Sequence, residues 1–151
     1  MMAVPRMSPL AFLAWVLVGC ASRPEPPTAR EAAPAAADVD WSRAEQVDVI
    51  LVDFSFRPSR IVLEHGHPYR LHLENRGSGG HNFDAPDFFR SVVLREDAAT
   101  ELRDGKGAVE LARDEVKDVY LVPTRAGTFP LECSHLLHAI IFGMTGEIEV
   151  R

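Results

Sequence analysis

The residues with the clearest capacity for chemistry lie near the C-terminus, between Cys133 and Met144. This segment holds a thiol, a histidine (His138) and a thioether within twelve residues. Soft sulfur donors combined with imidazole are the ligand set that favours copper over magnesium or calcium. The other methionines and the second cysteine, Cys20, all lie within the first 20 residues. Beyond them Cys133 is the only cysteine and Met144 the only methionine, which predicts that the two act as a pair.

Composition restricts the classes of function that the chain can have. Its 151 residues, 46% of them hydrophobic, suffice for the core of one domain. A net charge of −6 argues against a nucleic-acid-binding surface. No Ser/His/Asp or paired-carboxylate arrangement stands out, and one copper ion leaves no second metal centre to bind and reduce oxygen. We therefore expect that the protein is not an enzyme.

Residues 1–19 have the pattern of an export signal. Arg6 precedes an apolar run, residues 10–18, which is too short to span a bilayer. The sequence Leu17-Val18-Gly19-Cys20 resembles the lipobox of bacterial lipoproteins, in which the cysteine is lipidated and becomes the new N-terminus. The alternative is an ordinary signal peptide with a chance cysteine beside it. No Asp follows Cys20, which by the same resemblance predicts an outer-membrane lipoprotein that faces the periplasm.

Residues 20–46 are expected to be the lipidated cysteine and an extended tether. From residue 21 onward this stretch holds four prolines, many alanines and scattered charges. Such a composition cannot bury enough apolar surface to fold. The tether is rich in neither methionine nor histidine. The folded domain is expected to span residues 47–151.

From Val47 onward the chain consists of short strand-like runs. In the run 47–56, period-two alternation predicts an inward face made of Ile50, Val52, Phe54 and Phe56. Further strands are expected at 60–63, 69–75, 108–111, 116–122, 129–133 and 146–150. Phe88 and Phe89 are expected to be buried under a loop or short helix. Short strands at this spacing, without a long helical period, predict an all-β fold, an antiparallel β-sandwich.

An upstream segment completes the chemical pattern. Gly80-His81-Asn82-Phe83 follows a strand and a glycine-rich loop, whereas Cys133 is followed after four residues by His138. Gly143-Met144-Thr145-Gly146 then leads into the last strand. Together these segments resemble the cupredoxins, the plastocyanin- and azurin-like family of blue-copper domains, and the resemblance covers residues 47–151.

The resemblance implies a Greek-key β-sandwich with one copper ion. The implied ligands are His81, Cys133 and His138 in the equatorial plane and Met144 as the weak axial donor. Such a set suits both oxidation states of copper, so little reorganisation accompanies electron gain or loss. Asn82 would hold the cysteine loop in place.

Two assignments have alternatives. Five residues separate His138 from Met144, more than the ligand loops of the family usually have. Met144 is thus either the axial ligand or a methionine packed at the start of the last strand. Without its two partners, His81 would be interpreted as a residue that caps the glycine-rich loop. The remaining histidines are expected at the surface, namely His65, His67, His72 and His135.

The resulting hypothesis is a monomeric, periplasm-facing type 1 copper protein that transfers single electrons between redox partners. The alternatives are a periplasmic carrier or buffer that delivers copper itself, and a metal-free structural sandwich. A tether without methionine- or histidine-rich tracts favours electron transfer over copper handling. Six apolar residues flank His138, and they predict a small hydrophobic docking patch that includes Leu137 and Ile141.

Overall fold

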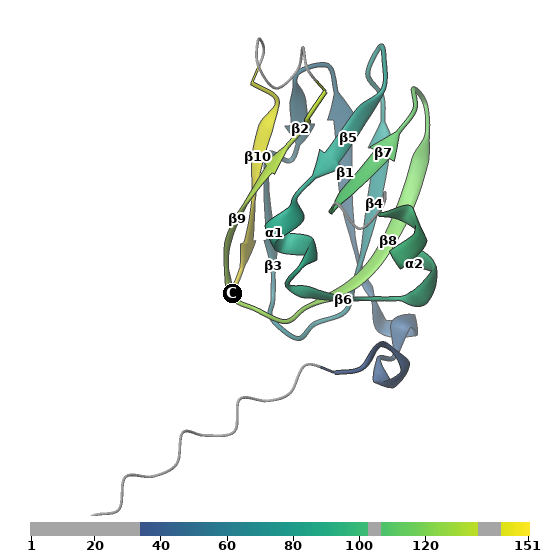
Figure 1. The fold of residues 1–151 in the computed structure, drawn as a ribbon, viewed down its shortest axis with the longest axis vertical. Helices are drawn as coiled ribbons and strands as arrows, with labels where there is room; N and C mark the ends of the chain where they lie inside the picture. The colour runs from purple at the N-terminus through teal and green to yellow at the C-terminus, as the bar shows by residue number, and fades with distance from the viewer. Residues whose placement is uncertain (1–33, 103–106, 136–142) are drawn as a thin grey trace, which may run out of the picture. The chain divides into compact units, whose positions relative to one another are not determined.

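The strands of the described residues, 34–102, 107–135 and 143–151, form two five-stranded sheets in a computed structural model (Figure 1). These residues belong to one compact unit, Ala32–Arg151. Within this described part of the chain, no helix is long and apolar enough to cross a membrane. The two sheets enclose the hydrophobic core, so the expected β-sandwich is confirmed.

The two sheets have distinct strand orders. The first sheet runs β2 (Ser55–Arg57), β1 (Glu45–Val52), β4 (Tyr69–Asn75), β8 (Val116–Pro123) and β6 (Val92–Leu94). The second sheet runs β3 (Arg60–Leu63), β10 (Thr145–Val150), β9 (Gly127–Glu132), β5 (His81–Asp84) and β7 (Ala108–Leu111). The helical elements are η1 (Ala36–Asp38), η2 (Trp41–Arg43), α1 (Pro86–Phe89) and α2 (Glu96–Glu101).

Most neighbouring strands pair antiparallel, but two pairs are parallel. These are β1 with β4 and β10 with β3. The chain leaves the first sheet after β2, forms β3 in the second sheet, and returns as β4 beside β1. Sequence periodicity shows which side of a strand is apolar, but not the direction of strands that are distant along the chain. The parallel pairs were therefore not expected.

The predicted inward face of the first run is wrong for most of its length. Val49 and Leu51 are fully buried, whereas Ile50 and Val52 are only partly buried. The chain turns at Asp53 and Phe54, so β1 and β2 form a hairpin in which Val52 pairs with Ser55. Phe54 adopts a positive φ of 68° and is 44% exposed. A turn inside an apolar run reverses the alternation that the sequence pattern assumed to be continuous.

The remaining strands carry the core as expected. In β4 every second residue is buried, and Phe129, Leu131 and Cys133 share one buried face. Residues 84–115, for which the sequence predicted only two buried phenylalanines and one strand, contain α1, β6, α2 and β7. Helix α1 packs Phe88 against Phe129 with ring centroids 5.7 Å apart, which confirms that this phenylalanine is buried under a short helix.

Residues 34–46 differ from the extended tether that we expected. They form two short 3-10 helices, and Trp41 packs edge-on against Tyr120 of β8 with ring centroids 6.4 Å apart. The backbone N–H of Glu45 donates to the carbonyl of Pro68 at 2.9 Å, and β1 begins at this residue. The packing of Trp41 thus extends the folded unit toward the N-terminus.

Candidate metal centre

Three buried residues with donor side chains lie at one end of the second sheet. His81 is the first residue of β5, Cys133 follows the last residue of β9, and Met144 precedes the first residue of β10. Strands β9 and β10 pair antiparallel with Glu132 opposite Thr145, so the residues just beyond that pair remain neighbours. The backbone N–H of Cys133 accordingly donates to the carbonyl of Met144 at 3.0 Å. All three side chains have 0% exposure.

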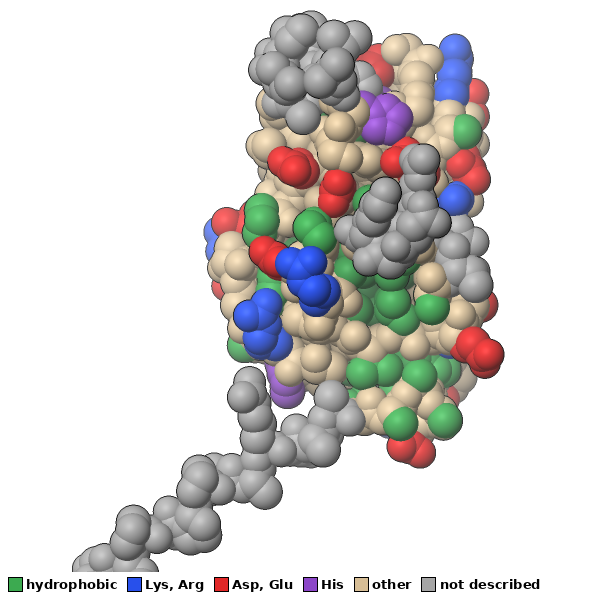
Figure 2. Space-filling view, viewed as in Figure 1, with side chains coloured by type: hydrophobic (Ala, Val, Ile, Leu, Met, Phe, Trp, Pro, Cys, Tyr) green, Lys and Arg blue, Asp and Glu red, His purple; other side chains and the backbone are tan. Residues whose placement is uncertain are grey.

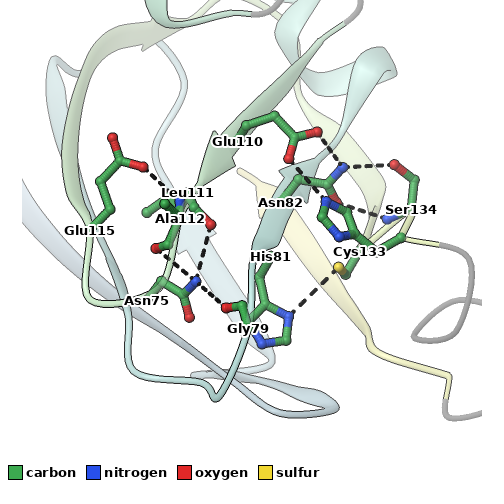
Figure 3. Close-up of polar contacts among 11 residues, drawn as sticks. Asn75, Gly79, His81, Asn82, Glu110, Leu111, Ala112, Glu115, Cys133 and Ser134 are labelled. Atoms are coloured by element: carbon green, nitrogen blue, oxygen red, sulfur yellow. Dashed lines mark hydrogen bonds and ion pairs between the residues drawn. The ribbon is translucent and has the colours of Figure 1, made fainter.

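The His81 ring points its Nδ1 at the sulfur of Cys133, 3.8 Å away (Figure 3). This distance permits a weak hydrogen bond between thiol and imidazole. It is also close to the separation of two donors that share one metal ion. With bonds of about 2.0 Å to nitrogen and 2.3 Å to sulfur, and angles of about 110–120°, donor atoms lie roughly 3.5–3.7 Å apart. The pair therefore fits a bound transition-metal ion with only a small adjustment.

Met144 adds a thioether to this pair, and a thiolate, an imidazole and a thioether form a soft donor set. Among the described residues, no group of three or more His, Cys, Asp and Glu side chains could hold a metal ion. His138, Leu137 and Ile141 lie outside the described residues, as does Cys20, and their assigned roles stay predictions.

Asn82 connects β5 to the loop that carries Cys133. Its Oδ1 accepts from the backbone N–H of Ser134 at 2.8 Å, and its Nδ2 donates to the Ser134 hydroxyl at 2.8 Å and to Glu110 at 3.1 Å (Figure 3). Glu110, on β7, also contacts His135 Nε2 at 3.0 Å. Asn82 thus contacts the cysteine loop through both polar atoms of its side chain. The effect of Asn82 on copper stays a prediction.

Asn75 is a site residue that the sequence analysis missed. Its side chain is fully buried, and its Nδ2 lies 2.9–3.1 Å from the carbonyl oxygens of Gly79, Leu111 and Ala112. Its Oδ1 accepts from the N–H of Gly77 at 2.9 Å. Asn75 thereby fixes both ends of the loop that delivers His81. One feature of the sequence could have identified Asn75. It is an asparagine at the last inward position of an alternating strand, shortly before the glycine-rich loop.

Asp53 and Gly77 support the other side of the His81 ring, and the sequence analysis missed both. Oδ1 of Asp53 lies 3.2 Å from His81 Nε2 and accepts from the N–H of Ser78 at 2.9 Å. The bond from Ser78, followed by smaller contributions that include the contact with His81, holds the pKa of this carboxyl below its ordinary value of 3.8. A β-carbon at Gly77 would lie 2.3 Å from His81 Nε2, so the ring lies directly against this glycine.

The other described histidines are exposed or partly exposed, as expected for surface residues. His72 Nδ1 lies 2.7 Å from Asp118, and His67 Nε2 lies 3.4 Å from Glu45. His135 is only partly exposed because it contacts Glu110. In Figure 2 acidic side chains gather around a histidine in the upper part of the visible face, and basic side chains are scattered.

Comparison with known proteins identifies the fold. No protein-family model matches the chain, and no curated protein matches it. Dithionite-reduced auracyanin from the photosynthetic bacterium Roseiflexus castenholzii superposes with a TM-score of 0.52 at 14% identity over 72% of this chain and 98% of that chain. Auracyanin B gives a TM-score of 0.52 at 20% identity over 72% of this chain and 90% of that chain.

Proposed function

We propose that this chain, whose fold is that of the cupredoxins, binds one copper ion and carries single electrons between partner proteins. The ligands in this proposal are His81, Cys133, His138 and Met144. The observation that carries it is the fully buried pair of His81 Nδ1 and Cys133 sulfur, 3.8 Å apart beside the buried Met144. Copper in such a donor set supplies a one-electron couple.

The protein contributes rigidity and exclusion of water to this chemistry. Asn75 fixes the loop before His81, and Asn82 holds the residue after Cys133. His81 is wedged between Gly77 and the cysteine. Ligands that are held in this way cannot relax far when the charge at the centre changes. A small rearrangement favours rapid gain and loss of an electron.

Burial of the donors supports electron transfer over copper delivery. A carrier that hands its ion to a client exchanges ligands with that client, which requires donors that the client can reach. Three of the four proposed ligands have no exposed surface. An electron, in contrast, needs only a short route to the surface and no ligand exchange.

The experiment that tests this proposal compares electron exchange with copper loss. Mixed oxidised and reduced copper protein should exchange electrons, visible as nuclear magnetic resonance line broadening that grows with protein concentration. Copper should stay bound in both oxidation states when a competing chelator is added. Loss of Cu(I) to the chelator without measurable electron exchange would instead identify a copper carrier.

The cellular setting is part of the same proposal. Lipid on Cys20 would anchor the protein to the outer membrane, because several acyl chains on one residue give stable anchoring. Cys20→Ser should release the folded, copper-competent protein from membranes. Wild-type protein that is found only in the soluble periplasmic fraction would contradict lipidation.

Partner docking is proposed at the apolar segment around His138. A transient redox contact falls at the small end of interface sizes, below about 1,200 Å². Ile141→Lys or Leu137→Lys should leave the copper spectrum unchanged and slow electron exchange with partners. An unchanged exchange rate would place the docking surface elsewhere.

A further inference from the structure

We infer that Asp53 is a positioning residue that orients His81 toward the metal and lowers the reduction potential of the site. The inference rests on the proposed function, because it assumes that His81 binds copper through Nδ1. It starts from the opposite edge of the same ring. There, Nε2 of His81 lies 3.2 Å from Asp53 Oδ1, at the turn between β1 and β2.

The position of Asp53 does not depend on a metal. Its Oδ1 also accepts from the backbone N–H of Ser78 at 2.9 Å, which joins the β1–β2 turn to the loop before β5. Gly77 lies between the two side chains, since a β-carbon there would lie 2.8 Å from Asp53 Oδ1 and 2.3 Å from His81 Nε2. Carboxylate, glycine and imidazole are thus packed together, and the ring has little freedom to rotate.

The contact selects which nitrogen of His81 presents its lone pair to a metal. A carboxylate is only an acceptor, so Nε2 carries the proton that it donates to Asp53. Nδ1, on the side of Cys133, is then the nitrogen with a lone pair. A carboxylate that accepts from the remote nitrogen of a ligand histidine fixes its tautomer and raises its basicity.

The charge of Asp53 gives the contact a second consequence. The side chain is 38% exposed while that of His81 is fully buried, so the carboxylate is partly hydrated beside a buried ring. A fixed negative charge near the ligand favours Cu(II) over Cu(I), because the oxidised ion carries one more positive charge. Removal of this charge should therefore raise the reduction potential.

The variant that isolates the charge is Asp53→Asn. Its amide oxygen can still accept from Ser78 and His81, but the negative charge is lost. Asp48→Asn is the matched control, because it removes a carboxylate from β1, the strand that leads into the same turn, at a residue that contacts Gln46. Asp53→Glu restores the charge and tests rescue.

The first readout needs no copper. In the metal-free wild type, the Nε2–H proton of His81 should resonate far downfield because a carboxylate accepts it. This resonance should move upfield in Asp53→Asn and stay in place in Asp48→Asn. The same chemical shift in wild type and Asp53→Asn would overturn the inference.

The second readout is the reduction potential of the copper-loaded proteins. Loss of a partner of this kind lowers metal affinity by about 10–100-fold. A tenfold loss confined to Cu(II) corresponds to a rise of about 59 mV for a one-electron couple. Asp53→Asn should show at least this rise, Asp53→Glu should show less, and Asp48→Asn should stay near the wild type.

The outcomes separate the inference from the proposed function. A wild type with a blue-copper spectrum, together with equal potentials for Asp53→Asn and Asp48→Asn, would overturn the inference alone. A wild type that forms no blue-copper centre would overturn the proposed function, and the role of Asp53 at the metal with it. A rise in potential in Asp53→Asn that Asp53→Glu reverses would support both.

Discussion

Replacement of Gly77 by alanine tests the packing that positions His81. The added β-carbon would lie 2.3 Å from His81 Nε2 and 2.8 Å from its Cδ2. Atoms of this kind rest about 3.5 Å apart, so the ring has to move by roughly 1 Å. Gly77 has no positive φ, so alanine adds no backbone strain and the clash acts alone.

The magnitude follows from the burial of the ring. His81 has no exposed surface, so its displacement overpacks a filled region, which typically costs about 1–3 kcal/mol. For a domain of this size, each kcal/mol lowers the Tm by about 4 °C, so a decrease of roughly 4–12 °C is expected. Metal–ligand distances tolerate only about 0.2 Å, so copper affinity should also fall by about tenfold or more.

The assay combines thermal unfolding of the metal-free protein with a Cu(II) titration. Gly79→Ala is the matched control, since its β-carbon would meet nothing within 4 Å in the same loop. That variant should keep the wild-type affinity, and its stability should be unchanged or raised by up to about 1 kcal/mol. Equal stability and affinity in the two variants would refute the packing argument.

Three further predictions address other parts of the molecule. Met144→Leu should keep the colour of the copper protein and raise its potential, because a weak donor to Cu(II) is lost; voltammetry with no shift would mean that Met144 is not a ligand. Asn75→Ala should lower the free energy of unfolding in urea by about 3 kcal/mol, since three close contacts to carbonyl oxygens disappear; a loss below about 1 kcal/mol would contradict this. Hydrogen bonds from Arg151 and Arg60 lower the pKa of Glu149 from 4.5 to about 2, so its contribution is complete above pH 4.5 and lost as pH falls through 2. Glu149→Gln should reduce the decline of stability over that range, and an unchanged decline in acid unfolding would oppose it.

Most of the fold could be predicted because alternation along each strand reflects burial directly. Tyr69, Leu71 and Leu73 are buried, as period-two alternation predicts for the expected strand at 69–75. The prediction of the inward face of β1 was wrong for a local reason. The turn at Asp53 and Phe54 contains neither glycine nor proline, so the sequence does not mark it. The parallel pairing of β1 with β4 depends on a path through both sheets that local patterns do not encode.

The metal ligands and the residues that support them differ in how far sequence reveals them. Cys133 and Met144 stand out because their side chains are chemically rare in this chain. Asp53 and Asn75 have ordinary side chains, and their roles arise from contacts with residues brought near by the fold, such as His81 and Leu111. Asn82 was identified by resemblance, since its neighbour Ser134 is 52 residues away in the chain.

The central claim is that His81 and Cys133 hold copper together, and one spectrum tests it most directly. The wild-type protein with one equivalent of Cu(II) should show an intense visible band from thiolate-to-copper charge transfer, and reductant should bleach it. Its electron paramagnetic resonance spectrum should be that of a type 1 centre. Cys133→Ser should abolish the band. A variant that keeps the band, or a wild type that binds only colourless Zn(II) or Cu(I), would contradict the assignment.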